Sequence, residues 1–525
     1  MAPAASRSGT VPGSGGRVSL AEQLVQTARC VQAVQAGRSL ADALPGVPGE
    51  LRPGVQALTF HALRHLGTTM ALVSVLAERT PPLAVRALLG SALALLLPGV
   101  VLAEAGKPMP PVPEDVGEAE QEVAASADMA DQLLEAGSST VPRYTAFTVV
   151  NQAVAAARSV RSLASQAGLV NACLRRFLRE SVALLAQVQT DWEAQWNHPA
   201  WWVKRVRRDH PQHWQTVLRA SNHPAPLTLR VNETRLDRAA YLEHLKPLGW
   251  ADFADGALVG TAGVTLARAG AARSGAVEAL PGYADGWFSV QDAAAQLAAP
   301  LLLGGASLRQ DGAGAQAARP LRVLDACAAP GGKTAHLLEA AHRLGLSLSL
   351  LALEVDAARS ERIVENLQRL QLPAPAHGAG LASDVHVKVA DAEAVPSWWD
   401  GQLFDAILLD APCTASGIGR RHPDVRWLRR ATDVTALVAT QRQLLDALWP
   451  LLAPGGRMVY CTCSVFKAEG QAQVDAFLSR HTDVRPASSP GHLLPGVALC
   501  GADWPDNSAG EHDGFFYAAL DKLPA

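Results

Sequence analysis

The chain has 525 residues, of which 49% are hydrophobic, and a formal net charge of −3. This length suggests about two to four domains with large apolar cores. The weak negative charge excludes binding of nucleic acid through bulk charge, so any such function must depend on local basic clusters. The seven cysteines are irregularly spaced and accompany no export signal, which favours reduced thiols in a cytoplasmic protein.

The first third of the chain is predicted to be helical. Residues 1–19 lack the apolar segment of a signal peptide and are expected to form a flexible tail. Residues 20–190 show helical periodicity, interrupted by a proline-rich acidic stretch, 104–140, which we interpret as a solvated surface insertion. Within 171–188, the helical spacing places one apolar side, formed by Leu174, Leu178, Val182 and Leu185.

Residues 87–103 form an uncharged apolar segment, ALLGSALALLLPGVVLA. Its length is at the lower limit for a membrane span. Pro98 and Gly99 interrupt it, however, and the sequence contains no second span. We therefore expect a buried core helix that ends at Leu97, and no membrane association.

Residues 191–280 differ in composition from the helices before them. They open with tryptophans and a basic run, NHPAWWVKRVRRDHPQHW, followed by the strand-like segment PLTLRVN. We expect a small α/β module here, which links the helical region to residues 281–522.

From residue 281 onward, strands are predicted to alternate with helices. The apolar runs predicted to be strands are 321–326, 348–354, 384–390, 404–410 and 457–463. This alternation is typical of the α/β fold class with a parallel, doubly wound sheet, in which ligands bind beyond the carboxyl ends of the strands.

Acidic, thiol and glycine residues follow these strands. They are Asp325, Cys327 and the loop APGGK after the first strand, Glu354 after the second, Asp391 after the third, Asp410 and Cys413 after the fourth, and Cys463 after the fifth. Because parallel strands end at the same edge of a sheet, we expect these residues to form one composite site.

The loop DACAAPGGKT admits two interpretations. Gly332, Lys333 and Thr334 match the end of a phosphate-binding P-loop of a nucleotide-hydrolysing protein, but Cys327 occupies the position of its first glycine. The alternative is a loop whose backbone approaches a nucleoside-bearing cofactor. Glu354 favours this alternative, because it follows the glycines at about the 20-residue spacing of an acid that holds a ribose hydroxyl.

Several segments carry a family resemblance. LDACAAPGGKT, LLDAPCTASGIGRRHPDVRW, VYCTCSVFKAEGQAQV, DGFFYAAL and GWFSVQDAAAQ resemble the Nop2/Sun family of RNA cytosine-5 methyltransferases. NACLRRF and HPAWWVKR further resemble the branch of this family that acts on bacterial 16S rRNA. The resemblance covers about residues 50–522, and it is most specific over 286–466.

The resemblance implies an architecture and a reaction. The architecture is a Rossmann-like methyltransferase domain, residues 281–522, with an all-α NusB-like RNA-binding domain, residues 20–190, and a small α/β RNA-binding module, residues 191–280, between them. The reaction is methyl transfer from S-adenosyl-L-methionine (SAM) to carbon 5 of cytosine 967, in a hairpin loop of 16S rRNA. A sister enzyme that acts on tRNA is the nearest alternative.

The chemistry of cytosine explains the need for a thiol. Carbon 5 is a poor nucleophile, and addition of a thiolate to carbon 6 activates it. The spacing of Cys413 and Cys463 does not decide which of them attacks. The resemblance assigns the attack to Cys463, the release step to Cys413, the contact with ring nitrogen 3 to Asp410 and the positioning of Asp410 to Lys333.

The remaining expected contacts concern the cofactor, the RNA and metals. SAM is expected to contact Cys327, Ala328, Ala329, Pro330, Gly331, Gly332, Lys333, Glu354, Asp391 and Asp410. RNA phosphates are expected to contact Arg175, Arg176, Lys204, Arg205, Arg420, Arg421 and Arg426. Cys461-x-Cys463 lacks the spacing of a zinc site, so we expect no metal. Cys461 is expected in the core, on the strand face opposite Cys463. We expect a monomeric protein that acts on naked or early-assembly 16S rRNA.

Overall fold

The computed structural model describes residues 18–105, 144–248, 250–252, 262–268, 277–304, 319–373, 382–498 and 510–524. These residues belong to two compact units that divide near residue 194. The tail expected over residues 1–19 lies outside the described residues, except for Val18 and Ser19. The acidic insertion at 104–140 also lies outside them, except for residues 104 and 105.

The first unit consists of helices in its described residues. They are α1 (Leu20–Gln35), α2 (Leu40–Ala43), α3 (Arg52–Arg64), α4 (Leu66–Leu76), α5 (Leu83–Ala105), α7 (Ala146–Ser159) and α8 (Ala167–Val188), followed by α9 (Trp192–Trp196). Ser19 begins α1 with a capping box: its hydroxyl accepts from the Glu22 N–H, and the Glu22 carboxylate accepts from the Ser19 N–H. This helical unit agrees with the fold class expected for the first third of the chain.

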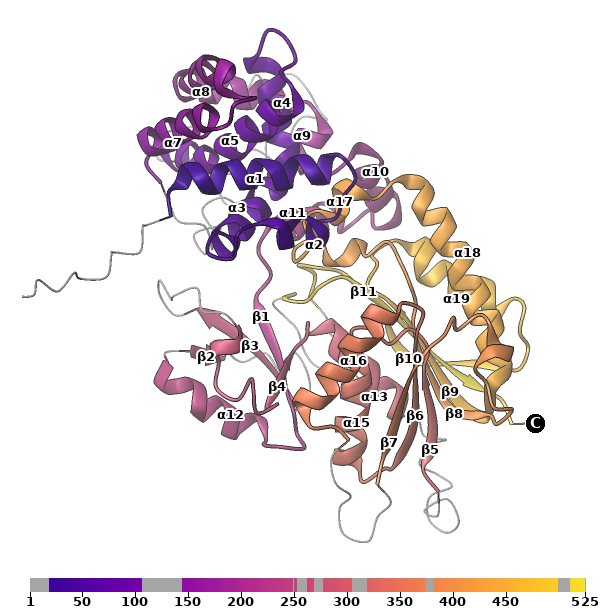
Figure 1. Cartoon of the computed structure of the whole chain (residues 1–525). Coiled ribbons are helices and arrows are strands. Elements are labelled where there is room, and N and C mark those ends of the chain that lie inside the picture. Colours follow the sequence, from indigo (N-terminus) through magenta and orange to yellow (C-terminus); the bar gives the residue numbers. More distant parts are fainter. Residues whose placement is uncertain are drawn as a thin grey trace, which may run out of the picture. The chain divides into compact units, whose positions relative to one another are not determined.

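Helix α5 is the central helix of this unit and packs against α1, α3, α4, α7 and α8 (Figure 1). Leu88, Leu89 and Leu93 are fully buried, which explains why the segment is apolar on all sides. The helix runs to Ala105, so the prediction that it ends at Leu97 is wrong. A proline removes one backbone hydrogen bond, and a helix can continue beyond it. No helix among the described residues is long and apolar enough to cross a membrane.

Helix α8 departs from regular geometry at Glu180, where φ is −119° and ψ is 18°. Leu174 and Leu185 are buried as predicted, but Val182 is 53% exposed. The prediction of one continuous apolar side is therefore wrong, because the kink turns the second half of the helix relative to the first.

The second unit begins with α10 (Ala200–Asp209) and α11 (Trp214–Asn222), which lead into a small antiparallel sheet with strand order β2-β3-β1-β4. The strands are β1 (Leu227–Val231), β2 (Trp250–Asp252), β3 (Gly263–Arg268) and β4 (Phe288–Val290). Helix α12 (Arg238–Leu245) buries Tyr241 and Leu245 in the same apolar cluster as Leu229, Val264 and Phe288. Pairing of β4 with β1 takes the small sheet beyond residue 280, the boundary expected from composition.

The larger sheet of this unit has seven strands in the order β10-β11-β9-β8-β5-β6-β7. They are β5 (Leu321–Asp325), β6 (Leu348–Glu354), β7 (Asp384–Val389), β8 (Phe404–Asp410), β9 (Leu452–Thr462), β10 (Val484–Leu493) and β11 (Phe515–Lys522). The five predicted strands, β5 to β9, are parallel. The expectation of a wholly parallel sheet is wrong for β10 and β11, because β11 pairs antiparallel with both β9 and β10.

Helices cover both faces of the larger sheet (Figure 1). On one face, α13 (Ala298–Leu303), α15 (Gly332–Leu344) and α16 (Ala357–Leu370) bury Leu302, Leu337 and Ile363. On the other face, α18 (Ala431–Leu448) and α19 (Gln471–Leu478) bury Leu445 and Phe477. This three-layer arrangement is the Rossmann-like α/β fold that was expected, and it leaves the carboxyl edge of the parallel strands free for ligands.

Candidate active site

The carboxyl ends of β5 to β9 meet at one edge of the sheet, as predicted. Asp410, the last residue of β8, pairs in register with Cys461 of β9. Register therefore brings the loop after β8 and the loop after β9 together, and each of these loops carries one of the two cysteines at issue.

Cys413 and Cys463 contact each other, with their sulfur atoms 3.4 Å apart. Two bonds hold the loops in this position. The Gly417 N–H donates to the Cys463 carbonyl at 2.9 Å, and the hydroxyls of Ser416 and Ser464 lie 2.8 Å apart. The two thiols thus lie side by side at this edge of the sheet.

Lys333 and Asp410 form an ion pair beside these thiols. The Lys333 Nζ donates to Asp410 Oδ2 at 2.6 Å, and it lies 5.2 Å from the centre of the Phe515 ring. The other Asp410 oxygen, Oδ1, accepts from the Cys461 thiol at 3.5 Å. An acid, a base and two thiols are therefore within reach of one small substrate.

Cys461 contradicts one prediction. It is fully buried, as expected, but it belongs to the same apolar cluster against which Cys463 packs. Residues two apart on a strand share a face, so the prediction that Cys461 faces away from Cys463 is wrong. Its thiol is part of the surroundings of Asp410.

The surroundings change the ionisation of these groups. The contact with Cys463, burial and the charge of Glu469 raise the pKa of Cys413 well above its usual range. Burial and the Asp410 carboxylate raise the pKa of Cys461. Burial alone would lower the pKa of Lys333, but the Asp410 carboxylate outweighs it and raises that pKa. At neutral pH, Cys413 and Cys461 are therefore thiols, and Lys333 is an ammonium.

The loop between β5 and α15 is shaped for close approach of a ligand to its backbone. Gly331 has a φ of 92°, which favours glycine, and a Cβ atom there would lie 3.0 Å from the Ile363 Cα. Helix α15 begins at the next residue, Gly332, so its free N–H groups point into this loop. Half-buried Cys327 and Ala329, buried Ala328 and exposed Pro330 complete the loop.

Glu354 and Asp391 stand where a nucleoside would extend from this loop. Glu354, at the end of β6, is 3% exposed, and its Oε1 accepts from the Asp356 N–H and from Arg359. Within the described residues its Oε2 has no such donor, so this oxygen suits a ribose hydroxyl. Asp391 is exposed just beyond β7 and accepts from the Glu393 N–H.

The arginine run after Cys413 does not form the surface that was predicted. Arg426 is fully buried, and it donates to Asn222, Ser221 and Gly419. The RNA contact predicted for Arg426 is therefore contradicted. Its guanidinium holds the last turn of α11 against the loop that follows Cys413.

Arg420 and Arg421 have a similar structural place. Arg420 is 5% exposed and pairs with Glu511 at 2.7 Å. Arg421 pairs with Asp292 at 2.7 Å and with Asp513 at 2.6 Å. Carboxylates within the unit pair with both guanidinium groups, which gives them a structural role, and the phosphate contacts predicted for them stay predictions.

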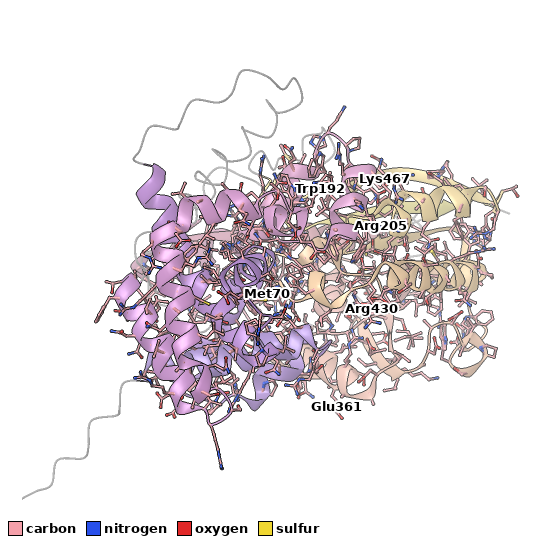
Figure 2. The ribbon with its side chains drawn as sticks, turned by 90° about the horizontal axis from the view of Figure 1, so that it is seen from above. Met70, Trp192, Arg205, Glu361, Arg430 and Lys467 are labelled. Atoms are coloured by element: carbon pink, nitrogen blue, oxygen red, sulfur yellow. The ribbon has the colours of Figure 1, made fainter. Side chains whose placement is uncertain are left out.

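The other predicted cluster stays at the surface. Lys204 is exposed on α10, and the Arg205 guanidinium lies 5.5 Å from the centre of the Phe466 ring (Figure 2). Trp202 packs against the same ring, with the two ring centres 5.0 Å apart. Because Phe466 follows Cys463 by three residues, the basic pair Lys204 and Arg205 lies beside the loop that follows Cys463. In the first unit, Arg175 is exposed, and Arg176 pairs with Glu180.

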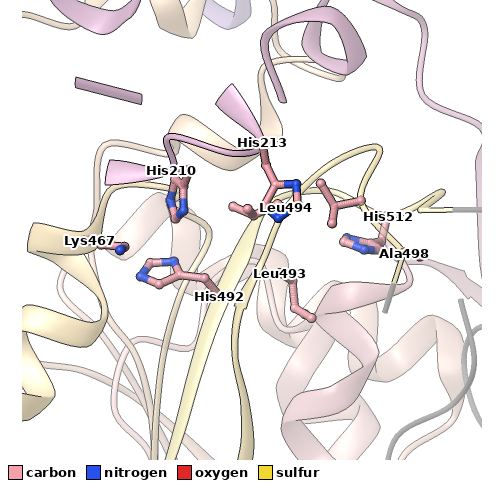
Figure 3. A pocket seen from close by; sticks show the side chains of 9 residues that line it. His210, His213, Lys467, His492, Leu493, Leu494, Ala498 and His512 are labelled. Atoms are coloured by element: carbon pink, nitrogen blue, oxygen red, sulfur yellow. The ribbon is translucent and has the colours of Figure 1, made fainter. Parts of the chain in front are cut away.

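A pocket of about 280 Å³ lies on the other side of the loop that follows Cys463 (Figure 3). It is lined by His210, His213, Lys467, His492, Leu493, Leu494, Val497, Ala498 and His512. His210 bonds the Val465 carbonyl at 2.6 Å, and burial lowers the pKa of His492 to about 3. This pocket was not predictable from the sequence, because its histidines come from three segments that are distant along the chain. No group of residues in the described part of the chain has the donors to hold a metal ion.

Glu469 is the residue of this site that sequence reasoning missed. It is fully buried in the short 3-10 helix Lys467–Glu469, six residues after Cys463. Its carboxylate accepts hydrogen bonds from Thr414 and Ser464, the residues that follow the two cysteines. The only signal in the sequence was one acid placed between two apolar segments, which does not distinguish a buried acid from an exposed one.

Comparison with known proteins identifies two family models in the second unit. The model described as "16S rRNA methyltransferase RsmB/F" matches residues 317–521. A model described as "Methyltr_RsmF/B-like, ferredoxin-like domain" matches residues 198–270. The first match covers the loop DACAAPGGKT, which removes support from its interpretation as the P-loop of a nucleotide-hydrolysing protein.

Individual proteins are similar over most of the chain. Ribosomal RNA small subunit methyltransferase B of Vibrio cholerae is 40% identical over 366 residues, 68% of this chain and 72% of its own length. The protein of the same name from Pseudomonas putida is 41% identical over 364 residues, 68% of this chain and 74% of its own. The crystal structure of PH0851 has a TM-score of 0.64 and 20% identity, and the match covers 96% of this chain and 99% of that one, which shows a shared fold.

Proposed function

The chain belongs to the RsmB/F family of 16S rRNA methyltransferases, and we propose that it transfers a methyl group from SAM to carbon 5 of a cytosine in 16S rRNA. The observation that carries the proposal is the pair of sulfur atoms 3.4 Å apart beside the Lys333–Asp410 ion pair. This arrangement suits covalent activation of a pyrimidine ring.

The residues around the β5–α15 loop fit SAM. If SAM binds here, the backbone of Cys327–Lys333 would hold its methionine part, Glu354 would hold the ribose hydroxyls, Asp391 would hold the adenine amine, and Asp410 would also contact the cofactor. Bound SAM supplies an electrophilic methyl group on a sulfonium sulfur. The protein's part is to place carbon 5 of the cytosine in line with that methyl group and to exclude water.

The thiolate of Cys463 forms a bond to carbon 6 and breaks the double bond between carbons 5 and 6. The negative charge that reaches the ring is stabilised by a proton shared between Asp410 and ring nitrogen 3, with Lys333 holding Asp410 in place. Carbon 5 then bonds to the methyl group, whose bond to the sulfonium sulfur breaks and leaves its electron pair on that sulfur. A water molecule takes the carbon-5 proton, the C–H electron pair restores the double bond between carbons 5 and 6, and the Cys463 sulfur leaves as a thiolate. The Cys413 thiol assists this release.

The target base must leave its stack to reach this edge of the sheet, which favours a hairpin loop such as the one with cytosine 967. In this proposal, Lys204 and Arg205 hold RNA phosphates beside the loop that follows Cys463, and Arg175 and Arg176 hold phosphates at a separate site on the helical unit. An rRNA substrate also implies action in the cytoplasm.

Methyl transfer from tritiated SAM to naked 16S rRNA, with the modified base mapped, tests the proposal. We expect label in 5-methylcytosine at one position. Cys463→Ala should lower kcat on the order of 10³-fold, because it removes the nucleophile. Cys413→Ala should accumulate a protein–RNA complex that survives denaturing electrophoresis, because release is impaired.

The same two variants test which cysteine attacks carbon 6 and which one assists release. A denaturation-resistant complex with Cys463→Ala and none with Cys413→Ala would reverse their assignment. Label in tRNA but not in 16S rRNA would contradict the substrate, and absence of SAM binding in calorimetry would contradict the whole proposal.

A further inference from the structure

The two cysteines lie in the same site, yet only one of them can be the attacking sulfur at a given moment. Their spacing in the sequence leaves the choice open, and so does the distance of 3.4 Å between their sulfur atoms. A further group must make them chemically different. The carboxylate of Glu469 contacts both cysteine loops.

Four hydrogen bonds reach the Glu469 carboxylate. Oε1 accepts from the Thr414 N–H at 2.8 Å and from the Gln441 side chain at 3.3 Å. Oε2 accepts from the Thr414 hydroxyl at 2.5 Å and from the Ser464 hydroxyl at 2.6 Å. Thr414 follows Cys413 and Ser464 follows Cys463, so one side chain fixes both loops.

Burial and local backbone geometry indicate that these bonds are needed to hold the two loops in place. Glu469 and Ser464 are both fully buried, so water cannot replace a lost partner. Ala415, between Thr414 and Ser416, has a φ of 58°, which is uncommon for a residue other than glycine. Its neighbours on both sides are bonded to Glu469 or Ser464, and such bonds keep a strained turn in one conformation.

We propose that Glu469 is a positioning residue that joins the two cysteine loops and, by its negative charge, keeps Cys413 protonated so that Cys463 is the sulfur that attacks. The Cys413 thiol then donates a hydrogen bond to the Cys463 sulfur, first as the thiolate forms and again as it departs from carbon 6. This inference rests on the proposed function for its chemistry, but not for its test.

The charges around Cys413 agree with this asymmetry. Contact with Cys463, burial, and the charges of Cys463 and Glu469 raise the pKa of Cys413. Burial raises the pKa of Tyr460 on β9, and so do the charges of Cys413, Glu469 and Cys461. Arg429 donates to the Thr414 carbonyl at 3.1 Å rather than to a sulfur atom.

Glu469→Gln separates charge from geometry. The glutamine oxygen can accept from the Thr414 N–H, and its amide group can donate to the Thr414 and Ser464 hydroxyls, so the loops stay joined while the charge is lost. Thr414→Val is the matched control, because it removes one hydrogen bond to Glu469 and leaves the charge. Glu469→Asp restores the charge with a shorter reach.

Each variant is made in the Cys463→Ala protein, and alkylation of Cys413 by iodoacetamide is followed by mass spectrometry from pH 6.5 to 10. We expect Glu469→Gln to raise the rate at pH 7.5 by about tenfold. We expect Thr414→Val and Glu469→Asp to stay within about threefold of the parent. Thermal melting confirms that each variant is folded. If Glu469→Gln is unfolded, Glu469→Met, which also removes the charge, takes its place in the same alkylation assay.

Equal pH profiles for Glu469→Gln and its parent would overturn the proposal, and so would a shift of equal size with Thr414→Val. In the protein with both cysteines, Glu469→Gln should lower kcat by about 10- to 100-fold with little change in KM. The alkylation assay needs no methyl transfer, so failure of this inference and failure of the proposed function give different results.

Discussion

At the scale of single residues, Asp325 is the buried acid that makes the site sensitive to pH. It is fully buried at the end of β5, where Oδ2 accepts from the Thr334 hydroxyl at 2.7 Å and Oδ1 has no hydrogen-bond partner. Burial, with a contribution from the Asp410 charge, raises its pKa to about 7. Between its ordinary pKa of about 3.9 and pH 7, the folded protein therefore holds a proton that the unfolded chain has lost.

The sign of the pH dependence follows. Because the folded state binds more protons in this interval, the free energy of unfolding falls as pH rises from about 4 to about 7, by at most about 1.4 kcal/mol per pH unit. Asp325→Asn should reduce that fall, and the part that remains is expected from Asp513, whose pKa burial and the Asp292 charge also raise to about 7. Urea unfolding followed by tryptophan fluorescence at pH 5, 6 and 7.5 measures it, and parallel curves for the variant and the native chain would contradict the prediction.

Residue types predicted which side chains would lie together better than they predicted which side chains would be buried. Cys413, Cys463, Asp410 and Lys333 follow predicted strands, and the parallel register brings them together. Arg426 was misjudged, because a run of arginines looks the same in sequence whether carbonyl groups or phosphates receive its donors. Whether Arg426 bonds to carbonyl groups or to phosphates depends on the segments packed against it, and these are remote in the sequence.

At the scale of elements, Arg230 joins the small sheet to the cofactor loop. From β1 its guanidinium donates to both carboxylate oxygens of Glu339 on α15 at 2.8 Å, to the Gly332 carbonyl at 2.8 Å and to Gln291. Arg230 and Glu339 are buried. The start of helix α15 is therefore held by a residue from the ferredoxin-like module.

Arg230→Met should lower the free energy of unfolding by about 3–5 kcal/mol, because it leaves the Glu339 charge buried without its partner. It should also weaken SAM binding, since the Gly332 carbonyl loses a donor. Arg230→Met with Glu339→Leu removes both charges and should recover most of the stability. Chemical unfolding and calorimetry measure both effects, and a double variant whose loss equals the sum of the single losses would contradict the prediction.

Strands β5 to β9 were predictable because each is a short apolar run bounded by turns and charged segments. Strands β10 and β11 were missed for different reasons. Strand β10 contains two prolines and a glycine in VRPASSPGHL, which are unusual within strands, and β11 was noticed only as the segment DGFFYAAL of the family. Their antiparallel pairing depends on contacts that alternation of strands and helices does not encode.

At the scale of the whole molecule, a chain with net charge −3 must bind RNA through local clusters. Lys204→Ala and Arg205→Ala should each weaken binding of a 16S rRNA fragment and lower the slope of log affinity against log salt by about one. Fluorescence anisotropy between 50 and 300 mM KCl measures this, with Arg362→Ala on α16, another exposed arginine, as the control. If neither variant changes this slope, the prediction that α10 contacts RNA is wrong.

Strand β11 lies between β9 and β10 but follows both in the chain. During synthesis, β10 therefore waits without a neighbour in the sheet until β11 has emerged from the ribosome. The Phe515 ring, which faces Lys333, arrives with the same strand. A nascent chain therefore contains both cysteines and the β5–α15 loop before its seven-stranded sheet is complete. Methyl transfer should begin only after translation has passed residue 522, the last residue of β11.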